Sequence, residues 1–422
     1  MTSGELAVRA RVALLFAPVG VRNYRLFWIA AAAWSGAVSM QTLALAVIAL
    51  DLTGRPSGWA AVLTAQAVAR GVLLPIGGVT ADLFGVRGIL VVFGVLQAMA
   101  GVAVAVASLA GALALSHLLG YALVAGAIQA LFMPALLSIT PELVPTPALH
   151  SANALSFATT SSARVAGPVA AGALLTVFGA SATLAAGAAC CLFAAACVSR
   201  IIMPAHAQAQ PATPLPLEAA GQGWRALRSN RVLMALIVPA ILLFVGYTAT
   251  IFIGLPSLAR LTLGMQPLEL GILYAAVGGG TLLGAVATGC VPGTEHQGIA
   301  GAAAVIGSGL AVLSLTAVDS LVWIVLLLVA GGTGTSAFLM FVSVLQSTTE
   351  AHVRARVASL VTLAIVAVYP ATFAVAGWVG DRLGPRAVVA LAGVAMALAG
   401  TLALSRADVR SLTIAAPAET PG

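Results

Sequence analysis

The residues of this sequence that could do chemistry are few, and two of them are arginines inside long apolar stretches. Arg70 lies in the stretch 58–80 and Arg164 in the stretch 152–177. If these stretches cross a membrane, a charge at that depth costs on the order of 3 kcal/mol or more unless it faces a cavity or a partner. We expect one or both to line a central cavity and attract an anionic group. Internal pairing of Arg70 and snorkelling of Arg164 to the membrane surface are the alternatives.

A group that could carry a proton is harder to find. Proton coupling needs a carboxylate or a histidine that is protonated in one state and not in the other, but no Asp or Glu lies at the centre of an apolar stretch. Asp51, at the end of the first stretch, and His117, in the fourth, are the candidates. A lone histidine is more often structural, and driving by the membrane potential or by the substrate's own gradient stays open.

The sequence predicts no metal site, no cofactor and no enzymatic activity. The four cysteines fall in apolar runs without metal-ligand spacing, and we interpret them as small core residues: Cys190, Cys191, Cys197 and Cys290. The Gly-x-x-x-x-Gly-Lys-Ser/Thr phosphate loop of an ATP motor is missing. No cluster of acids, His or Cys lies within the apolar stretches, which disfavours a membrane-embedded enzyme.

Composition indicates which elements must position the two arginines. Of 422 residues, 61% are hydrophobic and only 7% are charged, and the mean hydropathy is +1.09. Since a soluble protein has roughly 25% charged residues, most side chains here face lipid. The net charge is +7, and the basic residues are scattered among apolar segments. We therefore interpret them as residues that set the orientation of the protein in the membrane, and not as a nucleic-acid-binding surface.

A membrane-spanning helix needs about 20 apolar residues, and charges, prolines and polar clusters divide the chain into about twelve such segments. The first six are 26–50, 58–80, 87–108, 113–136, 152–177 and 180–201. The second six are 232–256, 268–290, 298–317, 320–344, 356–379 and 387–405. The expected fold is therefore all-α and integral to the membrane, with two pseudo-symmetric six-helix halves.

The predicted organisation is a cytoplasmic segment 1–25, a six-helix bundle 26–201, a proline-rich linker 202–231, a second bundle 232–405 and a tail 406–422. Most arginines outside the predicted helices fall on the side that holds the N-terminus, the linker and the tail. Cytoplasmic loops carry such an excess of basic residues. We therefore expect a multi-pass protein of the bacterial inner membrane, with both termini in the cytoplasm.

One motif lies between the second and third predicted helices, and its residues are Gly78, Asp82, Gly85 and Arg87. Gly78 would allow close helix packing and Gly85 a chain reversal. Asp82 can pair with a basic group or with the positive N-terminal end of a nearby helix, which would make a charge latch that closes and releases. An ordinary turn with a solvated Asp82 is the alternative.

This motif resembles the signature of the major facilitator superfamily, in which glycine, aspartate, glycine and basic residues follow one another. Basic residues usual in that family are replaced here by Leu83, Val86 and Gly88, so the resemblance implies a weaker latch. A second motif, Gly167-Pro168-Val169-Ala170-Ala171-Gly172, is similar to the Gly-Pro motif in helix 5 of major facilitator antiporters and exporters. Pro168 should bend the helix, and the glycines should give a flat face for a neighbouring helix.

Further local matches are Asn23-Tyr24-Arg25-Leu26-Phe27-Trp28, Asp51-Leu52-Thr53-Gly54, Phe132-Met133-Pro134-Ala135, Pro141-Glu142-Leu143-Val144, Ala152-Asn153-Ala154-Leu155 and Gly380-Asp381-Arg382-Leu383-Gly384-Pro385-Arg386. Together they resemble the branch that contains the enterobactin exporter and the macrolide-efflux proteins. The resemblance implies secondary active export of a drug, siderophore or secondary metabolite by alternating access, as proton-coupled antiport by a monomer.

In that family helices 1, 4, 7 and 10 line the cavity, which makes Gln41, Gln129, Tyr247 and Thr248 further candidates for substrate contact. Hydrogen bonding between helices is the commoner use of such side chains. Two other functions stay open: import of a metabolite by the same fold, and a non-transporting sensor or assembly protein on a transporter scaffold.

Overall fold

The structure is a computed structural model that describes residues 16–74, 85–202, 231–290, 297–334 and 351–410, together with Arg225 and Arg228. Gly78, Asp82 and most of the predicted linker 202–231 lie outside the described residues, as do the N-terminal 15 residues and the end of the predicted tail. The predictions made for them are therefore not addressed by the structure.

Every described secondary-structure element is a helix, which confirms the predicted all-α membrane fold. In the first half these are α2 (Arg22–Thr53), α3 (Pro56–Leu73), α5 (Val86–Leu109), α6 (Leu115–Leu143) and α7 (Leu149–Ser199). In the second half they include α9 (Arg231–Thr248), α11 (Pro267–Cys290), α12 (Gln297–Ser314), α13 (Leu321–Gly334), α15 (Ala351–Leu383), α16 (Pro385–Ser405) and the short α17 (Ala407–Arg410). Among the described residues, eight helices are long and apolar enough to cross a membrane.

Short helical pieces complete the chain. The 3-10 turns η1 (Ala17–Gly20), η3 (Thr146–Ala148) and η6 (Leu315–Ala317) flank α2, α7 and α12. After α9 the chain continues through a π-helix, η4 (Ala249–Gly254), one turn of α-helix, α10 (Leu255–Ser257), and a second π-helix, η5 (Leu258–Thr262). The predicted segment 232–256 is thus helical, but its second part has π geometry.

The two predicted segments 152–177 and 180–201 follow each other without a loop as the two arms of α7, which bends sharply between them. Gly179 is the residue with non-helical angles inside it, at φ 78° and ψ −175°, a region that only glycine populates readily. The chain reverses there, since both ends of α7 lie beside the start of α2. Tyr24 donates a hydrogen bond to the carbonyl of Ala152 over 2.7 Å, and the Asn23 side chain donates to the carbonyl of Ile202 over 2.8 Å.

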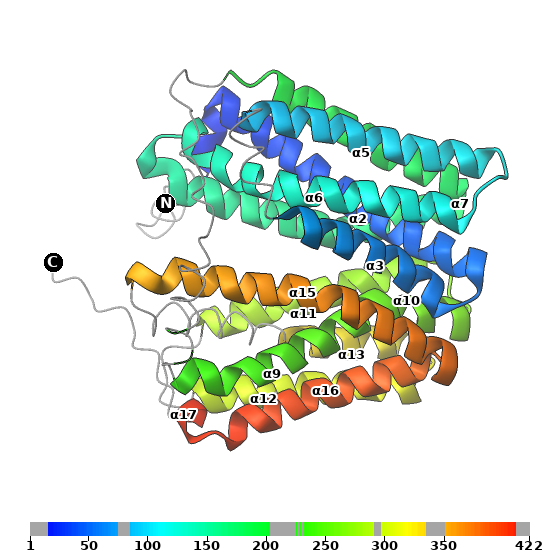
Figure 1. Cartoon of the computed structure of the whole chain (residues 1–422), viewed down its shortest axis with the longest axis vertical. Helices are drawn as coiled ribbons and strands as arrows, with labels where there is room; N and C mark the ends of the chain where they lie inside the picture. Colours follow the sequence, from blue (N-terminus) through cyan, green and yellow to red (C-terminus); the bar gives the residue numbers. More distant parts are fainter. Residues whose placement is uncertain are drawn as a thin grey trace, which may run out of the picture. The chain divides into compact units, whose positions relative to one another are not determined.

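Contacts divide the chain into two compact units, residues 1–52 with 65–214 (unit 1) and residues 53–64 with 215–422 (unit 2). Unit 1 contains α2, α5, α6 and α7, and unit 2 contains α9 to α17; within each unit the helices lie side by side (Figure 1). Helix α3 begins in unit 2 and ends in unit 1. The sequence did not predict that the first turns of this helix pack with the second half of the chain.

Small residues allow the helices of unit 2 to pack closely. A Cβ atom on Gly309 of α12 would lie 2.3 Å from the backbone nitrogen of Ala397 in α16, and one on Gly393 of α16 would lie 2.8 Å from the Gly309 carbonyl oxygen. A Cβ atom on Gly280 of α11 would likewise lie 2.3 Å from the Val329 carbonyl oxygen of α13. In lipid no hydrophobic driving force acts between helices, so close packing of this kind is what stabilises their association.

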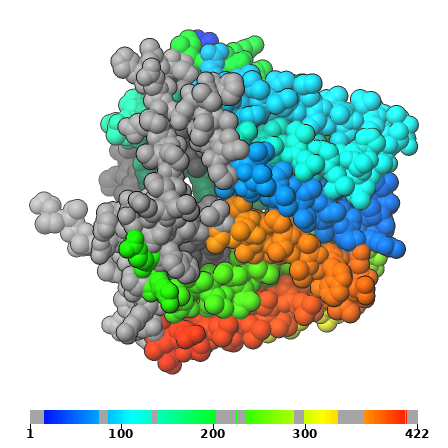
Figure 2. Space-filling model, in the orientation of Figure 1, coloured from blue at the N-terminus to red at the C-terminus, as the bar shows by residue number. Residues whose placement is uncertain are grey.

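Apolar side chains cover the outward faces of the helices. On α5 the exposed large apolar residues follow helical spacing: Val92, Leu96, Met99, Val102, Val106 and Leu109. Helix α5 forms the light blue part of the surface in Figure 2. The same pattern occurs on α16 at Leu391, Val394, Leu398 and Leu402. A long apolar stripe on the outside of a helix is the surface expected against lipid tails.

Candidate transport site

Arg70 is the strongest candidate for substrate contact in the described part of the chain. It lies in the last described turn of α3, and its side chain is partly buried. Its Nε atom is buried and has no hydrogen-bond partner among the described residues. Burying part of a guanidinium without a partner costs free energy, and a bound anion would offset that cost.

Close packing fixes the part of α3 that carries Arg70. A Cβ atom on Gly126 of α6 would lie 2.2 Å from the carbonyl oxygen of Gln66 and 3.0 Å from the Cβ of Ala69. The backbones of α3 and α6 therefore touch directly one turn before Arg70. This contact fixes the backbone from which the Arg70 side chain extends.

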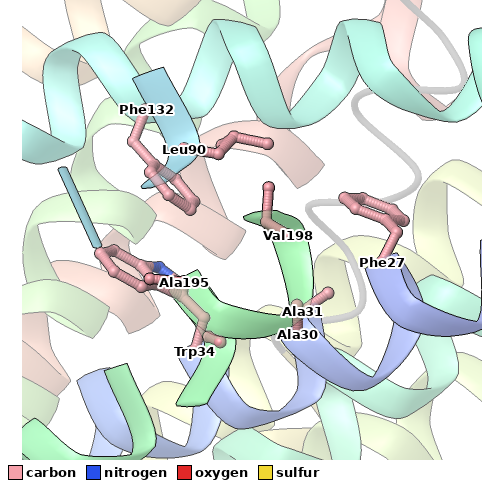
Figure 3. A pocket seen from close by; sticks show the side chains of 9 residues that line it. Phe27, Ala30, Ala31, Trp34, Leu90, Phe132, Ala195 and Val198 are labelled. Atoms are coloured by element: carbon pink, nitrogen blue, oxygen red, sulfur yellow. The ribbon is translucent and has the colours of Figure 1, made fainter. Parts of the chain in front are cut away.

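Unit 1 also contains a small apolar pocket, with room for about one water molecule. The pocket is lined by residues of four helices: Phe27, Ala30, Ala31 and Trp34 of α2, Leu90 of α5, Phe132 of α6, and Ala194, Ala195 and Val198 of α7. The Trp34 and Phe132 rings stack with their centroids 4.1 Å apart, and the side chains of Phe27, Phe132 and Val198 point toward one another (Figure 3). The lining is apolar and offers few polar anchors.

Gln41 lies inside unit 1 in a buried hydrogen-bond network. Its Oε1 accepts hydrogen bonds from the Tyr121 hydroxyl over 2.7 Å and from Gln97 Nε2 over 3.2 Å, and Gln97 also donates to the Tyr121 hydroxyl. Gln41 is 1% exposed, and it fills space left open by Gly101 and Gly187. In this structure Gln41 does not line an open cavity, and bonding between α2, α5 and α6 is the role that the geometry supports.

The other cavity candidates lie apart from this network. Arg164 is exposed on α7 and Gln129 is partly buried on α6. In unit 2, Tyr247 is partly buried near the end of α9, and the adjacent Thr248 is 1% exposed. The assignment of these four side chains to the substrate site stays a prediction.

The described part of the predicted gating motif shapes the start of α5. Gly85 precedes that helix with a φ of 68°, a left-handed conformation that other residues rarely adopt. Arg87 donates a hydrogen bond to the backbone carbonyl of Ser199 at the C-terminal end of α7. In this structure Arg87 therefore anchors α5 to α7, a contact that the motif alone did not predict.

The predicted helix-5 motif packs against α2. A Cβ atom on Gly167 would lie 2.7 Å from the Cβ of Ser39 and 3.2 Å from the Gly36 carbonyl oxygen. Pro168, Ala171 and Gly172 are buried. The α-helix continues through Pro168 without a break in its helical angles, and a flat contact face is the feature of this motif that the structure displays.

The two predicted proton carriers occupy helix ends. His117 is exposed in the first turn of α6, where its Nδ1 accepts a hydrogen bond from the backbone N–H of Ala114 over 3.1 Å. That bond satisfies a donor that the helix start leaves free, which favours the structural role of His117, and its role as a proton carrier stays a prediction. Asp51 is exposed in the last turn of α2.

Glu142 is a titratable residue whose role the sequence did not predict. It lies near the end of α6, ten residues beyond the apolar window Leu115–Phe132. Its side chain is partly buried, and its Oε2 atom is buried without a hydrogen-bond partner among the described residues. Burial raises the pKa of the Glu142 carboxyl, because the charged form loses hydration without gaining a partner.

This shift predicts a pH dependence of stability. A carboxyl whose pKa is raised on folding stabilises the folded state below its unfolded pKa, and that contribution is lost as pH rises through the folded pKa. The melting temperature of the Glu142→Gln variant should therefore fall less between pH 4 and pH 8 than that of the unmodified protein. Thermal unfolding in detergent measures it, with Glu142→Asp as the titratable control. Equal pH profiles for the Gln variant and the unmodified protein would contradict the assignment.

Comparison with known proteins defines the class of this chain. The profile of the transmembrane secretion effector family, MFS_3, matches residues 13–418. The nucleoside transporter NupG has a TM-score of 0.66 at 12% identity, over 90% of this chain and 99% of its own. A bacterial homolog of the human lysosomal transporter Spinster has a TM-score of 0.66 at 14% identity in its inward-facing, occupied form, over 93% of this chain and 97% of its own.

The fold and the membrane helices thus define a secondary transporter of the major facilitator superfamily, a multi-pass membrane protein. Within that superfamily, the chain belongs to the transmembrane secretion effector family. The solved structures share only the fold, at 12% and 14% identity, and do not indicate the cargo of this chain. No curated protein sequence matches the chain significantly.

Proposed function

We propose that the protein exports a small molecule by alternating access, as a proton-coupled antiporter of the enterobactin-exporter and macrolide-efflux branch. The observation that carries the proposal is Arg70, a partly buried cation whose Nε has no partner among the described residues of a chain built from apolar helices. A transporter that binds an anionic group near mid-membrane requires such a residue. The family description, which refers to secretion, supports export over import.

The cargo class that fits the described part of unit 1 is a lipophilic molecule with an anionic group. Arg70 offers the charge, and the pocket lined by Phe27, Trp34 and Phe132 offers apolar surface. For the proton, Asp51 and His117 stay the candidates from the sequence. Glu142 joins them because its carboxyl has a buried oxygen without a partner and a raised pKa.

Transport by the purified protein in proteoliposomes tests this proposal. We expect movement of at least one member of a panel of lipophilic anions, lipophilic cations, macrolides and siderophores, and we expect a pH gradient to accelerate it. Protein-free liposomes are the control for leakage. Transport that does not respond to the pH gradient would overturn proton coupling, and a complete lack of movement for the whole panel would contradict the exporter assignment.

A further inference from the structure

Four residues recur in this chain at one spacing: a glycine, an aspartate four residues later, a glycine three after that and an arginine two further on. The first set is Gly78, Asp82, Gly85 and Arg87, and the second is Gly377, Asp381, Gly384 and Arg386. The first set lies between α3 and α5, and the second joins α15 to α16. The predicted gating motif therefore has a second copy near the end of the chain.

The two copies have the same local structure where both are described. Gly85 and Gly384 each precede the next helix, with φ of 68° and 86° and ψ of 146° and 163°. Each arginine lies in the first turn of that helix and anchors it to a neighbour. Arg87 donates to the Ser199 carbonyl, and Arg386 pairs with the Asp319 carboxylate over 2.5 Å.

Asp381 contacts the start of α3. Its Oδ1 accepts a hydrogen bond from the backbone N–H of Ser57 over 3.0 Å. Pro56, the first residue of α3, has no N–H, so Ser57 offers the first free donor of that helix. A carboxylate at this position also interacts favourably with the positive end of the helix dipole.

The glycines of the second copy allow α3 to approach α15. A Cβ atom on Gly377 would lie 2.4 Å from the Cβ of Ala60, and one on Gly380 would lie 2.7 Å from the Cβ of Pro56. Gly377, Gly380 and Asp381 share one face of α15, since residues three and four apart are neighbours on a helix. The two glycines leave room for Ala60 and Pro56 of α3 on that face.

Trp59 adds a third contact. It is 1% exposed, and its Nε1 donates a hydrogen bond to the carbonyl of Phe252 in the π-helix η4 over 2.6 Å. The Phe252 ring meets Phe373 of α15 edge-on, with centroids 5.7 Å apart. The first two turns of α3 are thus held in unit 2 by a carboxylate, a glycine face and an indole.

We propose that residues 377–386 form a second latch, in which Asp381 holds the first turn of α3 on α15 and releases it once in each transport cycle. The inference rests on the proposed alternating access. It makes Asp381 a positioning residue that sets how long one end of the transporter stays closed. In place of an ion pair, the latch uses the hydrogen bond between the Asp381 carboxylate and the N-terminus of α3. This bond can break without leaving a buried charge, because Asp381 is exposed near the C-terminal end of α15.

A reversible cross-link tests whether the release is required. Cys190, Cys191, Cys197 and Cys290 are first replaced by alanine, and cysteines are then placed at Pro56 and Gly380. The pair Ala311→Cys with Gly331→Cys is the matched control, because it joins α12 to α13 inside unit 2 at a Cβ separation of 3.8 Å. Oxidation should stop transport by the Pro56–Gly380 pair, reductant should restore it, and the control pair should transport in both states.

Labelling of Ser57→Cys by a maleimide in lipid nanodiscs tests the latch without any cargo. Replacing Asp381 by alanine should raise the labelling rate about two- to thirtyfold, the range expected for loss of a capping side chain. Glu269→Ala, which removes a carboxylate of unit 2 that accepts from the backbone N–H of Gln266 at the start of α11, should leave the rate unchanged.

The outcomes separate the latch from the proposed function. Transport by the oxidised Pro56–Gly380 pair, or equal labelling rates in the Asp381→Ala and Glu269→Ala variants, would overturn the latch. If the reduced protein moved no cargo while Asp381→Ala still accelerated labelling, the latch would stand and the exporter assignment would fail.

Discussion

Replacing Arg70 by methionine should abolish transport while the protein still folds into the membrane. Methionine keeps the length and the apolar stem of the side chain but removes the charge. If Arg70 binds an anionic group, cargo binding should weaken by on the order of 30-fold or more, as for loss of one partner from a buried charge pair. Stability should not fall, because the unmodified guanidinium has a buried Nε atom without a described partner.

Transport and thermal unfolding measured on the same preparation distinguish this role from a structural one. Arg70→Lys should keep part of the transport, since it keeps the positive charge. Arg200→Met is the matched control, because Arg200 is exposed just beyond the end of α7. A methionine variant that unfolds at lower temperature and transports normally would indicate that Arg70 is paired within the protein.

Replacing Gly309 by valine should destabilise the protein strongly. The nearest atoms to a side chain at this position belong to the backbone of α16, at 2.3 Å from an added Cβ. Backbone cannot rotate away as a side chain can, so α12 and α16 would have to separate. We expect a loss of about 3 kcal/mol, at the upper end of the usual range for overpacking.

Gly307→Val is the control for this prediction, because Gly307 lies on the same helix two residues earlier and has no atoms within 4 Å of an added Cβ. Its effect should stay within about 0.5 kcal/mol. Thermal unfolding in detergent measures both variants. Equal melting temperatures would show that the close contact between α12 and α16 does not limit stability.

The positions of the helices could be predicted from the sequence, because the bilayer imposes their length and composition. Each of the twelve predicted segments coincides with a described helix or with its described part, including 87–108 with α5 and 387–405 with α16. Lipid cannot hydrogen-bond to a backbone, so a long apolar run has little alternative to a helix. Local apolar content alone is therefore enough to predict where the helices lie in the sequence.

The contacts between helices could not be predicted in the same way, because apolar content does not say which face meets which neighbour. Gln41 was a candidate for the cavity, but its partners Gln97 and Tyr121 come from two other helices. Whether the Gln41 side chain faces a cavity or bonds to other helices depends on where α5 and α6 lie. The same reason explains why the Ser57–Asp381 bond, between residues 324 positions apart in sequence, was not predicted.

For Asp381, a signal was present in the sequence. The spacing of glycine, aspartate, glycine and arginine at 377–386 repeats that at 78–87. A repeated spacing indicates a repeated backbone geometry, since a glycine with a positive φ is needed at the same place in both turns. It does not identify the partner, because Asp381 contacts a helix from the other half of the sequence.

The reversal at Gly179 has a consequence for how the chain enters the bilayer. The two arms of α7 follow each other without any polar connection that could wait in water while the second arm is synthesised. We expect the translocation machinery to release the two arms into lipid as a preassembled pair. Any residue other than glycine at that one position would hinder membrane integration of both arms, because the reversal needs its positive φ.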